Sequence, residues 1–308
     1  MYASIDIGTN TALLLVAEIK NGKLQVIREE QRVPRLGQGV DAHKNVSESA
    51  MQRVIVALKE YRQILENEYQ EVSQVYLTGT SAFRDAANRG AFMQKIKDET
   101  GLEMCLLSGM DEARLTYKGA LGVLNELFNE QQNYVIDIGG GSSEVACGEG
   151  QRLSDSHSFD MGSVRYTERF LKHDPPISSE MEAARNEIER TLNEKQFKPY
   201  PGSKLIGVAG TVTSLAFIEK GMTTYVSEPL NGYLLSLKII QQYIKNFSEQ
   251  NTEEIRAQYP EVMKGRADII LAGLLILEAF MMHYNFEKLT VSTGGIRHGI
   301  ILDKVSRE

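Results

Sequence analysis

Residues 135–144 read VIDIGGGSSE, an apolar run that ends in an aspartate and continues into three glycines and two serines. Apolar residues resume after Glu144, so the stretch predicts a strand, a tight turn and a second strand. Glycines let the backbone adopt positive φ and approach a ligand closely. Successive N–H groups in such a turn can bind an anion. The turn therefore predicts a phosphate-sized site, formed by Gly140, Gly141, Ser142 and Ser143.

A second stretch near the start of the chain has the same order. Residues 5–11 read IDIGTNT, and Asp6 precedes Asp137 by 131 positions. The same offset relates the pair Gly79-Thr80 to the pair Gly210-Thr211. One such match is typical of unrelated hairpins, but two matches at one offset predict a duplicated domain. Each half then has one phosphate loop, and the first comprises Gly8, Thr9, Asn10 and Thr11.

Composition narrows the class of protein. The chain has 308 residues, 42% hydrophobic and 24% charged, with a net charge of −7, which fits two soluble domains. The acidic balance argues against a general nucleic-acid surface. The longest apolar run, 269–282, contains Glu278 and is too short to span a bilayer. Cys105 and Cys147 have no metal-type spacing and no secretion signal opens the chain, so we expect a cytoplasmic protein.

The order of elements predicts an α/β protein of two lobes. Each half opens on a three-stranded meander and continues into helices and further strands, which gives a mixed sheet flanked by helices. Polar residues 129–133 mark the boundary. We expect a first domain at 1–124, a second at 125–296, and a C-terminal helix at 297–308 that packs back on the first domain. Ligand sites in α/β proteins lie at strand ends and between domains, which predicts an active site in the interdomain cleft.

Three acids stand beside the predicted glycine turns: Asp6, Asp137 and Glu144. Aspartate is an ordinary turn residue, so one case alone carries little weight. Three acids at two paired loops favour a Mg²⁺ site, because Mg²⁺ bound with phosphates uses one or two carboxylates and water.

Each of three further charged residues has both a structural and a chemical interpretation. Arg84 follows a strand in a loop of small hydroxyl residues and is either a surface arginine or a phosphate ligand. Glu112 lies in the first turn of a helix predicted at 109–128, where an acid commonly offsets the helix dipole. It is also a candidate general base for water attacking phosphorus. Arg266 precedes a long apolar helix and is either a capping residue or a ligand.

Seven motifs, in order, resemble those of the exopolyphosphatase and guanosine pentaphosphatase (Ppx/GppA) family, within the actin, sugar kinase and Hsp70 superfamily. The resemblance runs from residue 2 to about residue 301 and implies two ribonuclease H-like, actin-like ATPase domains. The motifs are IDIGTNT at 5–11, GTSAFRDA at 79–86, LSGMDEARL at 107–115, VIDIGGGSSE at 135–144, GSVRYTE at 162–168, GTVTS at 210–214 and RAD at 266–268.

The resemblance also implies a reaction and residue roles. The reaction is Mg²⁺-dependent hydrolysis of a terminal phosphoanhydride in inorganic polyphosphate. Glu112 matches the family's catalytic glutamate, Glu144 its second acid, and Arg84 its phosphate-binding arginine. Asp137 and Asp6 match metal-linked acids, together with Glu144. Phosphates are expected at the two glycine loops, at Gly210 and Thr211, and more weakly at Arg266.

Several alternatives stay open. The guanosine pentaphosphate pppGpp would use the same catalytic residues as polyphosphate. The chain ends at residue 308, without the helical domain that extends the polyphosphate channel in longer relatives, which favours short chains or pppGpp and leaves a homodimer undecided. A non-hydrolytic nucleotide switch of the actin or Hsp70 type is a further alternative, although Arg84 and Glu112 favour a hydrolase.

Overall fold

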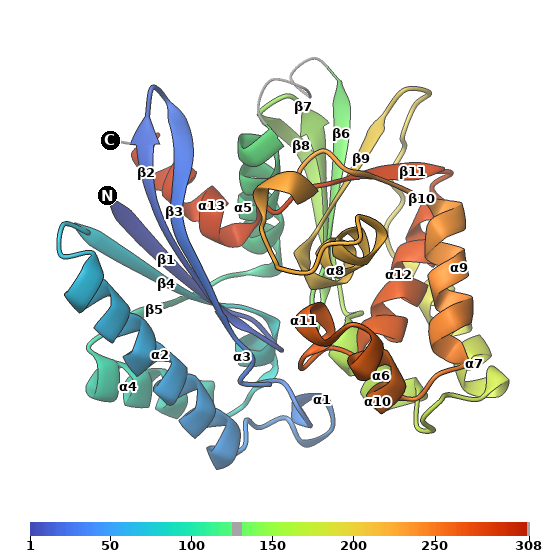
Figure 1. Ribbon diagram of the computed structural model, residues 1–308, viewed down its shortest axis with the longest axis horizontal. Coiled ribbons are helices and arrows are strands. Elements are labelled where there is room, and N and C mark those ends of the chain that lie inside the picture. Colours follow the sequence, from blue (N-terminus) through green and yellow to red (C-terminus); the bar gives the residue numbers. More distant parts are fainter. Residues whose placement is uncertain (125–130, 307–308) are drawn as a thin grey trace. The chain divides into compact units, whose positions relative to one another are not determined.

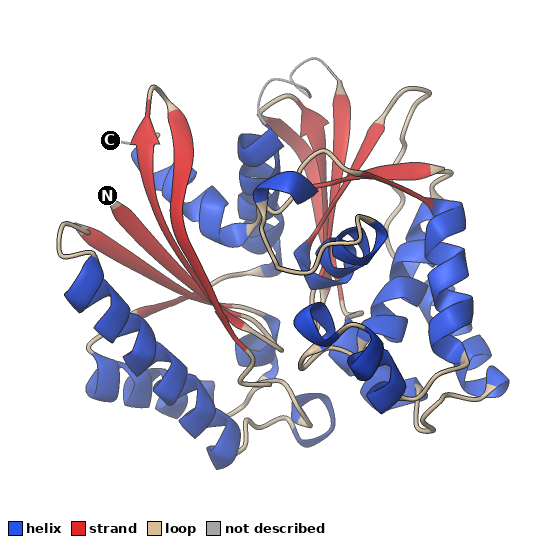
Figure 2. Cartoon of the chain, in the orientation of Figure 1, coloured by secondary structure: helices blue, strands red, loops and turns tan. Residues whose placement is uncertain are grey.

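The computed structural model describes residues 1–124 and 131–306. The chain divides into two compact units, one formed by Met1–Gly122 with the segment from Gly294 onward, and one running from Val123 to Thr293. Each unit contains one sheet flanked by helices, which Figure 2 separates by colour. The predicted class of two mixed α/β sheets is confirmed.

The first unit has a five-stranded sheet in the order β3-β2-β1-β4-β5. Strand β2 is apolar on both faces and is buried on both, as its sequence predicted. One face packs against α2 and α4, and the other against α5 and α13 (Figure 1). The strands are β1 (Tyr2–Ile7), β2 (Ala12–Lys20), β3 (Lys23–Arg32), β4 (Gln74–Gly79) and β5 (Met104–Leu106). The helices are α1 (Val40–His43), α2 (Glu48–Glu68), α3 (Ser81–Asp85), α4 (Arg89–Thr100), α5 (Gly109–Leu124) and α13 (Ile296–Val305).

The second unit has a six-stranded sheet in the order β10-β11-β9-β6-β7-β8. Its core centres on α12, which packs against α6, α7 and α9. The strands are β6 (Gln132–Ile138), β7 (Ser143–Glu149), β8 (Arg152–Phe159), β9 (Lys204–Val208), β10 (Leu234–Ser236) and β11 (Lys288–Val291). The helices are α6 (Ser163–Phe170), α7 (Ser178–Leu192), α8 (Ala209–Glu219), α9 (Leu237–Ser248), α10 (Thr252–Gln258), α11 (Pro260–Met263) and α12 (Ile270–His283), with a 3₁₀ turn at Glu228–Leu230. Within the described ranges, no helix is long and apolar enough to cross a membrane.

Both units have one strand plan. In the first, β1 pairs antiparallel with β2 and parallel with β4; in the second, β6 pairs antiparallel with β7 and parallel with β9. The turns agree in atomic detail: Gly8 N donates to Thr11 O at 2.9 Å, and Gly139 N donates to Ser142 O at 3.0 Å. These pairs are 131 positions apart, which supports the predicted duplication. The pairing with the parallel strand is shifted by one residue between the two units. Asp6 pairs with Thr78, whereas Asp137 pairs with Val208, and an offset of 131 would require residue 209.

The C-terminal helix α13 is fastened to the first unit by polar contacts. Arg297 donates to Leu14 O at 3.0 Å and lies 3.2 Å from the Glu29 carboxylate. Asp303 accepts from Arg114 at 2.8 Å, and the Ser4 hydroxyl donates to Arg297 O at 2.9 Å. These contacts place the guanidinium of Arg297 at strands β2 and β3, where its charge lowers the pKa of the Asp6 carboxyl group.

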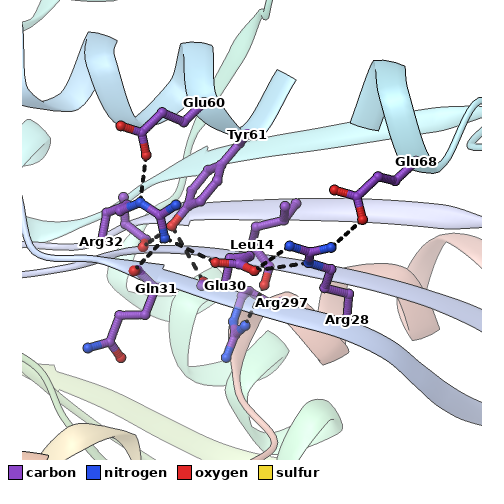
Figure 3. Close-up of polar contacts among 10 residues, drawn as sticks. Leu14, Arg28, Glu30, Gln31, Arg32, Glu60, Tyr61, Glu68 and Arg297 are labelled. Carbon is purple, nitrogen blue, oxygen red and sulfur yellow. Dashed lines mark hydrogen bonds and ion pairs between the residues drawn. The ribbon is translucent and has the colours of Figure 1, made fainter. Parts of the chain in front are cut away.

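Edge strand β3 is covered by charged side chains that reach helix α2 (Figure 3). Arg32 donates to Glu60 at 2.6 Å, and Arg28 pairs with Glu68 and Glu30. Charges on an edge strand disfavour pairing with another chain. From the same helix, the Tyr61 hydroxyl donates to the Ala12 carbonyl at 2.7 Å, which fixes the residue that follows the first phosphate loop.

Short elements were missed in three predicted loops. The structure forms α1, which begins at the end of the loop predicted at 31–41, and α3 within the loop predicted at 79–85. It also forms a 3₁₀ turn within the loop predicted at 221–235 and β10 at the end of that loop. Each is too short to show a helical or strand period in sequence. The expectation that Arg84 lies in a loop is therefore wrong, because it belongs to α3. The helix predicted at 109–128 is described as far as Leu124, and its last four residues lie outside the described ranges.

Candidate active site

The first phosphate loop follows β1 and is tied down through its carbonyl groups. Gly37 N donates to Thr9 O at 2.7 Å, and Arg35 N donates to Asn10 O at 3.0 Å. Arg35 adopts a φ of 51°, a conformation that costs energy for a non-glycine residue and persists where the surroundings hold it. The loop between β3 and α1 therefore fixes the turn formed by residues 8–11.

Asp6 lies at the end of β1, beside this turn, and is half-buried. Desolvation raises the pKa of its carboxyl group from 3.8 to about 6, against the opposing effects of a hydrogen bond from Thr78 and the charge of Arg297. The Thr78 hydroxyl donates to Asp6 Oδ1 at 3.1 Å. A carboxylate whose charged form is disfavoured by its surroundings is a group that a bound cation would stabilise.

Arg84 and Glu112 form a direct ion pair within the first unit. Arg84 Nη1 lies 2.5 Å from Glu112 Oε2 and 3.2 Å from the Leu107 carbonyl oxygen. Glu112 is only 6% exposed, unlike the neighbouring acid Asp111, whose side chain is 53% exposed. Ser108 caps α5 by accepting from Asp111 N at 3.1 Å. Glu112 is thus a buried carboxylate held against an arginine. An acid that only offsets the helix dipole needs neither burial nor an arginine partner.

The start of α6 holds the second phosphate loop by hydrogen bonds to the carbonyl groups of the loop. The Gly139 carbonyl accepts from Ser163 N at 2.9 Å, and the Gly140 carbonyl accepts from the backbone N–H groups of residues 164 and 165. The buried side chain of Arg165 donates from Nε to Gly141 O at 2.5 Å. Three consecutive carbonyl groups therefore point toward α6. The sequence indicates Arg165 only as part of the motif at 162–168, because nothing local links it to a loop 24 residues earlier.

Close approach to this loop requires glycine at position 162. A Cβ atom there would lie 2.5 Å from the carbonyl carbon of Gly140 and 2.6 Å from that of Gly141. We expect Gly162→Ala to displace the loop, to cost about 1–3 kcal/mol in free energy of unfolding, and to raise KM for the phosphate substrate. Urea denaturation and initial-rate kinetics measure the two effects. Gly90→Ala is the control, since a Cβ there meets nothing within 4 Å; equal behaviour of the two variants would contradict the prediction.

Two acids face each other across β6 and β7. Asp137 and Glu144 are direct partners in the antiparallel register, so their side chains lie on one face of the sheet. Both are buried, Glu144 at 2% exposure, and the Ser158 hydroxyl donates to Glu144 Oε1 at 2.6 Å. Directly opposed like charges destabilise a sheet, and a cation between them removes that cost. Oxygen ligands of this kind fit Mg²⁺.

The metal set predicted from sequence is not assembled within either unit alone. Among the described residues, no group of three His, Cys, Asp or Glu side chains converges as a metal cluster. Asp137 and Glu144 belong to the second unit and Asp6 to the first. A site in the second unit would thus have two carboxylates, which is sufficient for Mg²⁺ that also binds water and substrate phosphate.

A third candidate anion-binding feature lies at the start of α8. Arg266 Nη1 donates to the Ser214 hydroxyl at 3.1 Å, and a Cβ atom at Gly210 would lie 2.5 Å from Arg266 Cζ. Ala209 adopts a φ of 64° where the helix begins. Desolvation lowers the pKa of Arg266, and the charge of Tyr225 opposes that effect. A cation at a helix N-terminus is unfavourable unless an anion joins it, so Arg266, Gly210 and Thr211 favour a shared phosphate site.

The predicted site residues therefore form four groups: Asp6 with the loop 8–11, Arg84 with Glu112, Asp137 and Glu144 with the loop 140–143, and Arg266 with Gly210 and Thr211. The first two groups belong to the first unit and the others to the second. Three of the groups combine hydroxyl or backbone donors with an acid or an arginine, and the pair Arg84 and Glu112 joins an arginine to an acid.

Comparison with known proteins identifies relatives along the whole chain. A phosphatase of Fusobacterium nucleatum, named bifunctional 3-dehydroquinate synthase/phosphatase, is 31% identical over the whole chain, which spans 47% of that protein. Exopolyphosphatase 2 of Mycobacterium tuberculosis is 33% identical, with 97% of each chain covered. A guanosine-5'-triphosphate,3'-diphosphate pyrophosphatase of Photobacterium profundum is 30% identical over the whole chain, which covers 60% of that protein.

Solved structures agree with these relatives. The Ppx/GppA family member of Aquifex aeolicus superimposes with a TM-score of 0.82 at 31% identity, covering 99% of this chain and 97% of the other. An exopolyphosphatase from Cytophaga hutchinsonii gives a TM-score of 0.86 at 28% identity, with 98% of each chain covered. The sequence profile of the Ppx/GppA phosphatases matches residues 15–308. The chain therefore belongs to the Ppx/GppA phosphatase family.

Proposed function

We propose that this phosphatase removes the terminal phosphate from inorganic polyphosphate, with Mg²⁺ and with Glu112 as the base for the attacking water. The observation that carries the proposal is the contact of 2.5 Å between Arg84, which is partly exposed, and the buried carboxylate of Glu112. It joins a cation suited to phosphate oxygens to a carboxylate that can accept a proton. The name of the mycobacterial relative supports the polyphosphate substrate.

The reaction follows from these groups. A water oxygen attacks the terminal phosphorus, its proton passes to the Glu112 carboxylate, and the bond to the bridging oxygen breaks, so that orthophosphate and a shortened chain leave. Phosphoryl transfer to water depends mainly on positioning and on charge neutralisation. The terminal phosphate competes with Glu112 for the Arg84 guanidinium, which releases the carboxylate to act on water.

The remaining groups bind and orient the substrate. The loops 8–11 and 140–143, with Gly210, Thr211 and Arg266, hold phosphates through backbone donors, hydroxyl groups and one guanidinium. Asp137 and Glu144 would hold Mg²⁺, with Asp6 as a further acid, and the ion would supply charge neutralisation to the phosphate oxygens.

A second candidate is the 5'-phosphohydrolysis of pppGpp, favoured by the name of the Photobacterium relative. It requires the same chemistry at the same residues. A non-hydrolytic nucleotide switch is the alternative of another class. The chain is proposed to work in the cytoplasm, without nucleic acid or membrane partners, and a homodimer is left to measurement.

Phosphate release is the test. The protein is incubated with Mg²⁺ and polyphosphates of defined length, pppGpp, ATP or ADP, and orthophosphate is measured. We expect release from polyphosphate that stops when the metal is chelated. Release from none of these substrates, together with tight ATP binding, would replace the hydrolase with the switch.

A further inference from the structure

One face of helix α8 bears two neighbouring features that point to different parts of a ligand. Gly210, Ser214 and Phe217 are spaced by four and three residues, so they lie on the same side of the helix. Arg266 lies against the first two. Tyr225 stacks on the third, with ring centroids 6.2 Å apart and planes at 18°. A guanidinium and an aromatic ring therefore follow each other along α8, starting from its N-terminus.

Tyr225 is held in place but remains accessible. Its backbone N–H donates to Glu261 Oε1 at 3.4 Å, which ties the loop after α8 to α11. Arg266 comes five positions after Glu261, so one short segment anchors both the ring and the guanidinium. Phe217 is 4% exposed, whereas Tyr225 is 44% exposed. A tyrosine backed by a buried ring on one side and open to solvent presents a stacking surface.

The spacing between the two features suits a nucleotide. Residues 210 and 217 are about 10 Å apart along the helix axis, given a rise of 1.5 Å per residue. That length is comparable to the reach of a nucleoside polyphosphate from its phosphates to its base. Inorganic polyphosphate has no planar group that could occupy the ring surface.

We propose that Tyr225 is a stacking platform for the base of a nucleoside polyphosphate whose phosphates lie at Arg266 and the N-terminus of α8. The proposal rests on the proposed function for the phosphate end, and it assigns to Tyr225 the recognition of the base in the nucleotide candidate, pppGpp, over inorganic polyphosphate. Tyr225 then sets specificity and does not take part in bond breaking.

The first test compares two substrates in three variants. The ratio of kcat/KM for pppGpp to kcat/KM for tripolyphosphate is measured in wild type, Tyr225→Ala, Tyr225→Phe and Tyr200→Ala. Stacking of a base on an aromatic side chain is worth roughly 5-fold to 150-fold in affinity. We expect the ratio to fall by that factor in Tyr225→Ala, through KM, and to be kept in Tyr225→Phe, which retains the ring.

Tyr200→Ala is the matched control, because Tyr200 is 49% exposed and also belongs to the second unit. It should leave both rates at the wild-type value. An unchanged ratio in Tyr225→Ala would overturn the platform, as would an equal loss in Tyr225→Ala and Tyr225→Phe, which would assign the effect to the hydroxyl group.

Calorimetric titration with GTP separates this proposal from the proposed function, because it needs no turnover. Weaker GTP binding to Tyr225→Ala than to Tyr200→Ala supports the platform even if no substrate is hydrolysed. Equal GTP binding by the two variants removes the platform, whatever the rate of phosphate release from tripolyphosphate.

Discussion

Glu112→Gln should lower kcat for phosphate release by roughly 10²-fold to 10⁴-fold, the usual contribution of a general base. Glutamine keeps the size and the hydrogen-bonding carbonyl of the side chain but cannot accept a proton from water at neutral pH. The substrate KM should change far less, because the phosphate loops are untouched. Steady-state kinetics with tripolyphosphate measure both constants.

Asp111→Asn is the control for this variant. It makes the same chemical change one residue earlier, at a side chain that is 53% exposed and serves the cap of α5. Its kcat should equal that of wild type. Glu112→Gln also removes a charge partner of Arg84, so its unfolding curve is measured to show that the lost turnover is not lost folding. A well-folded Glu112→Gln variant with wild-type kcat would remove the base assignment.

Asp6→Asn should stabilise the metal-free protein while it weakens catalysis. The carboxyl group of Asp6 has a pKa of about 6 in the folded chain, against 3.8 for the ordinary value. The ionised group at pH 8 therefore costs up to about 3 kcal/mol, and less in so far as water reaches this half-buried side chain. Asparagine removes the charge and can still accept the hydrogen bond from Thr78.

The raised pKa of Asp6 determines how the free energy of unfolding changes with pH. Between about pH 4 and pH 6 the folded chain binds a proton at Asp6 that the unfolded chain has released, so stability falls as pH rises. The variant lacks this effect. Its advantage over wild type should be near zero at about pH 4 and complete above about pH 7. Urea denaturation across this range measures it.

Mg²⁺ provides the second half of the Asp6 experiment. If Asp6 contributes to cation binding, Mg²⁺ should stabilise wild type more than Asp6→Asn, because a ligand stabilises the state that binds it. An advantage of the variant that does not change with pH would contradict the account of the Asp6 charge.

Local chemistry made the fold and the loops predictable. The GGG turn, its echo at residues 5–11 and the offset of 131 identify two equivalent units, because a strand, an acid and a glycine turn are encoded by neighbouring residues. The elements that escaped prediction, such as α3 and β10, span five and three residues and leave no period.

Contacts between distant residues were harder to predict. The pairing of Arg84 with Glu112 joins residues 28 positions apart. Local sequence left Arg84 open between a surface arginine and a phosphate ligand, and it favoured a helix-dipole acid at Glu112. Arg266 lies 52 positions from Ser214, its partner on α8. Tyr225 had no signal in sequence, since its role depends on the ring of Phe217 behind it. Family resemblance supplied the roles of Arg84 and Glu112, and the structure supplied the contacts.

The most direct test of the central claim is hydrolysis of tripolyphosphate by the wild-type protein in water enriched in oxygen-18, with Mg²⁺ present. If water attacks the terminal phosphorus, the released orthophosphate carries one labelled oxygen, and Glu112→Gln forms this product far more slowly. Orthophosphate without label, or no release of orthophosphate by a folded protein that binds the substrate, would contradict the account.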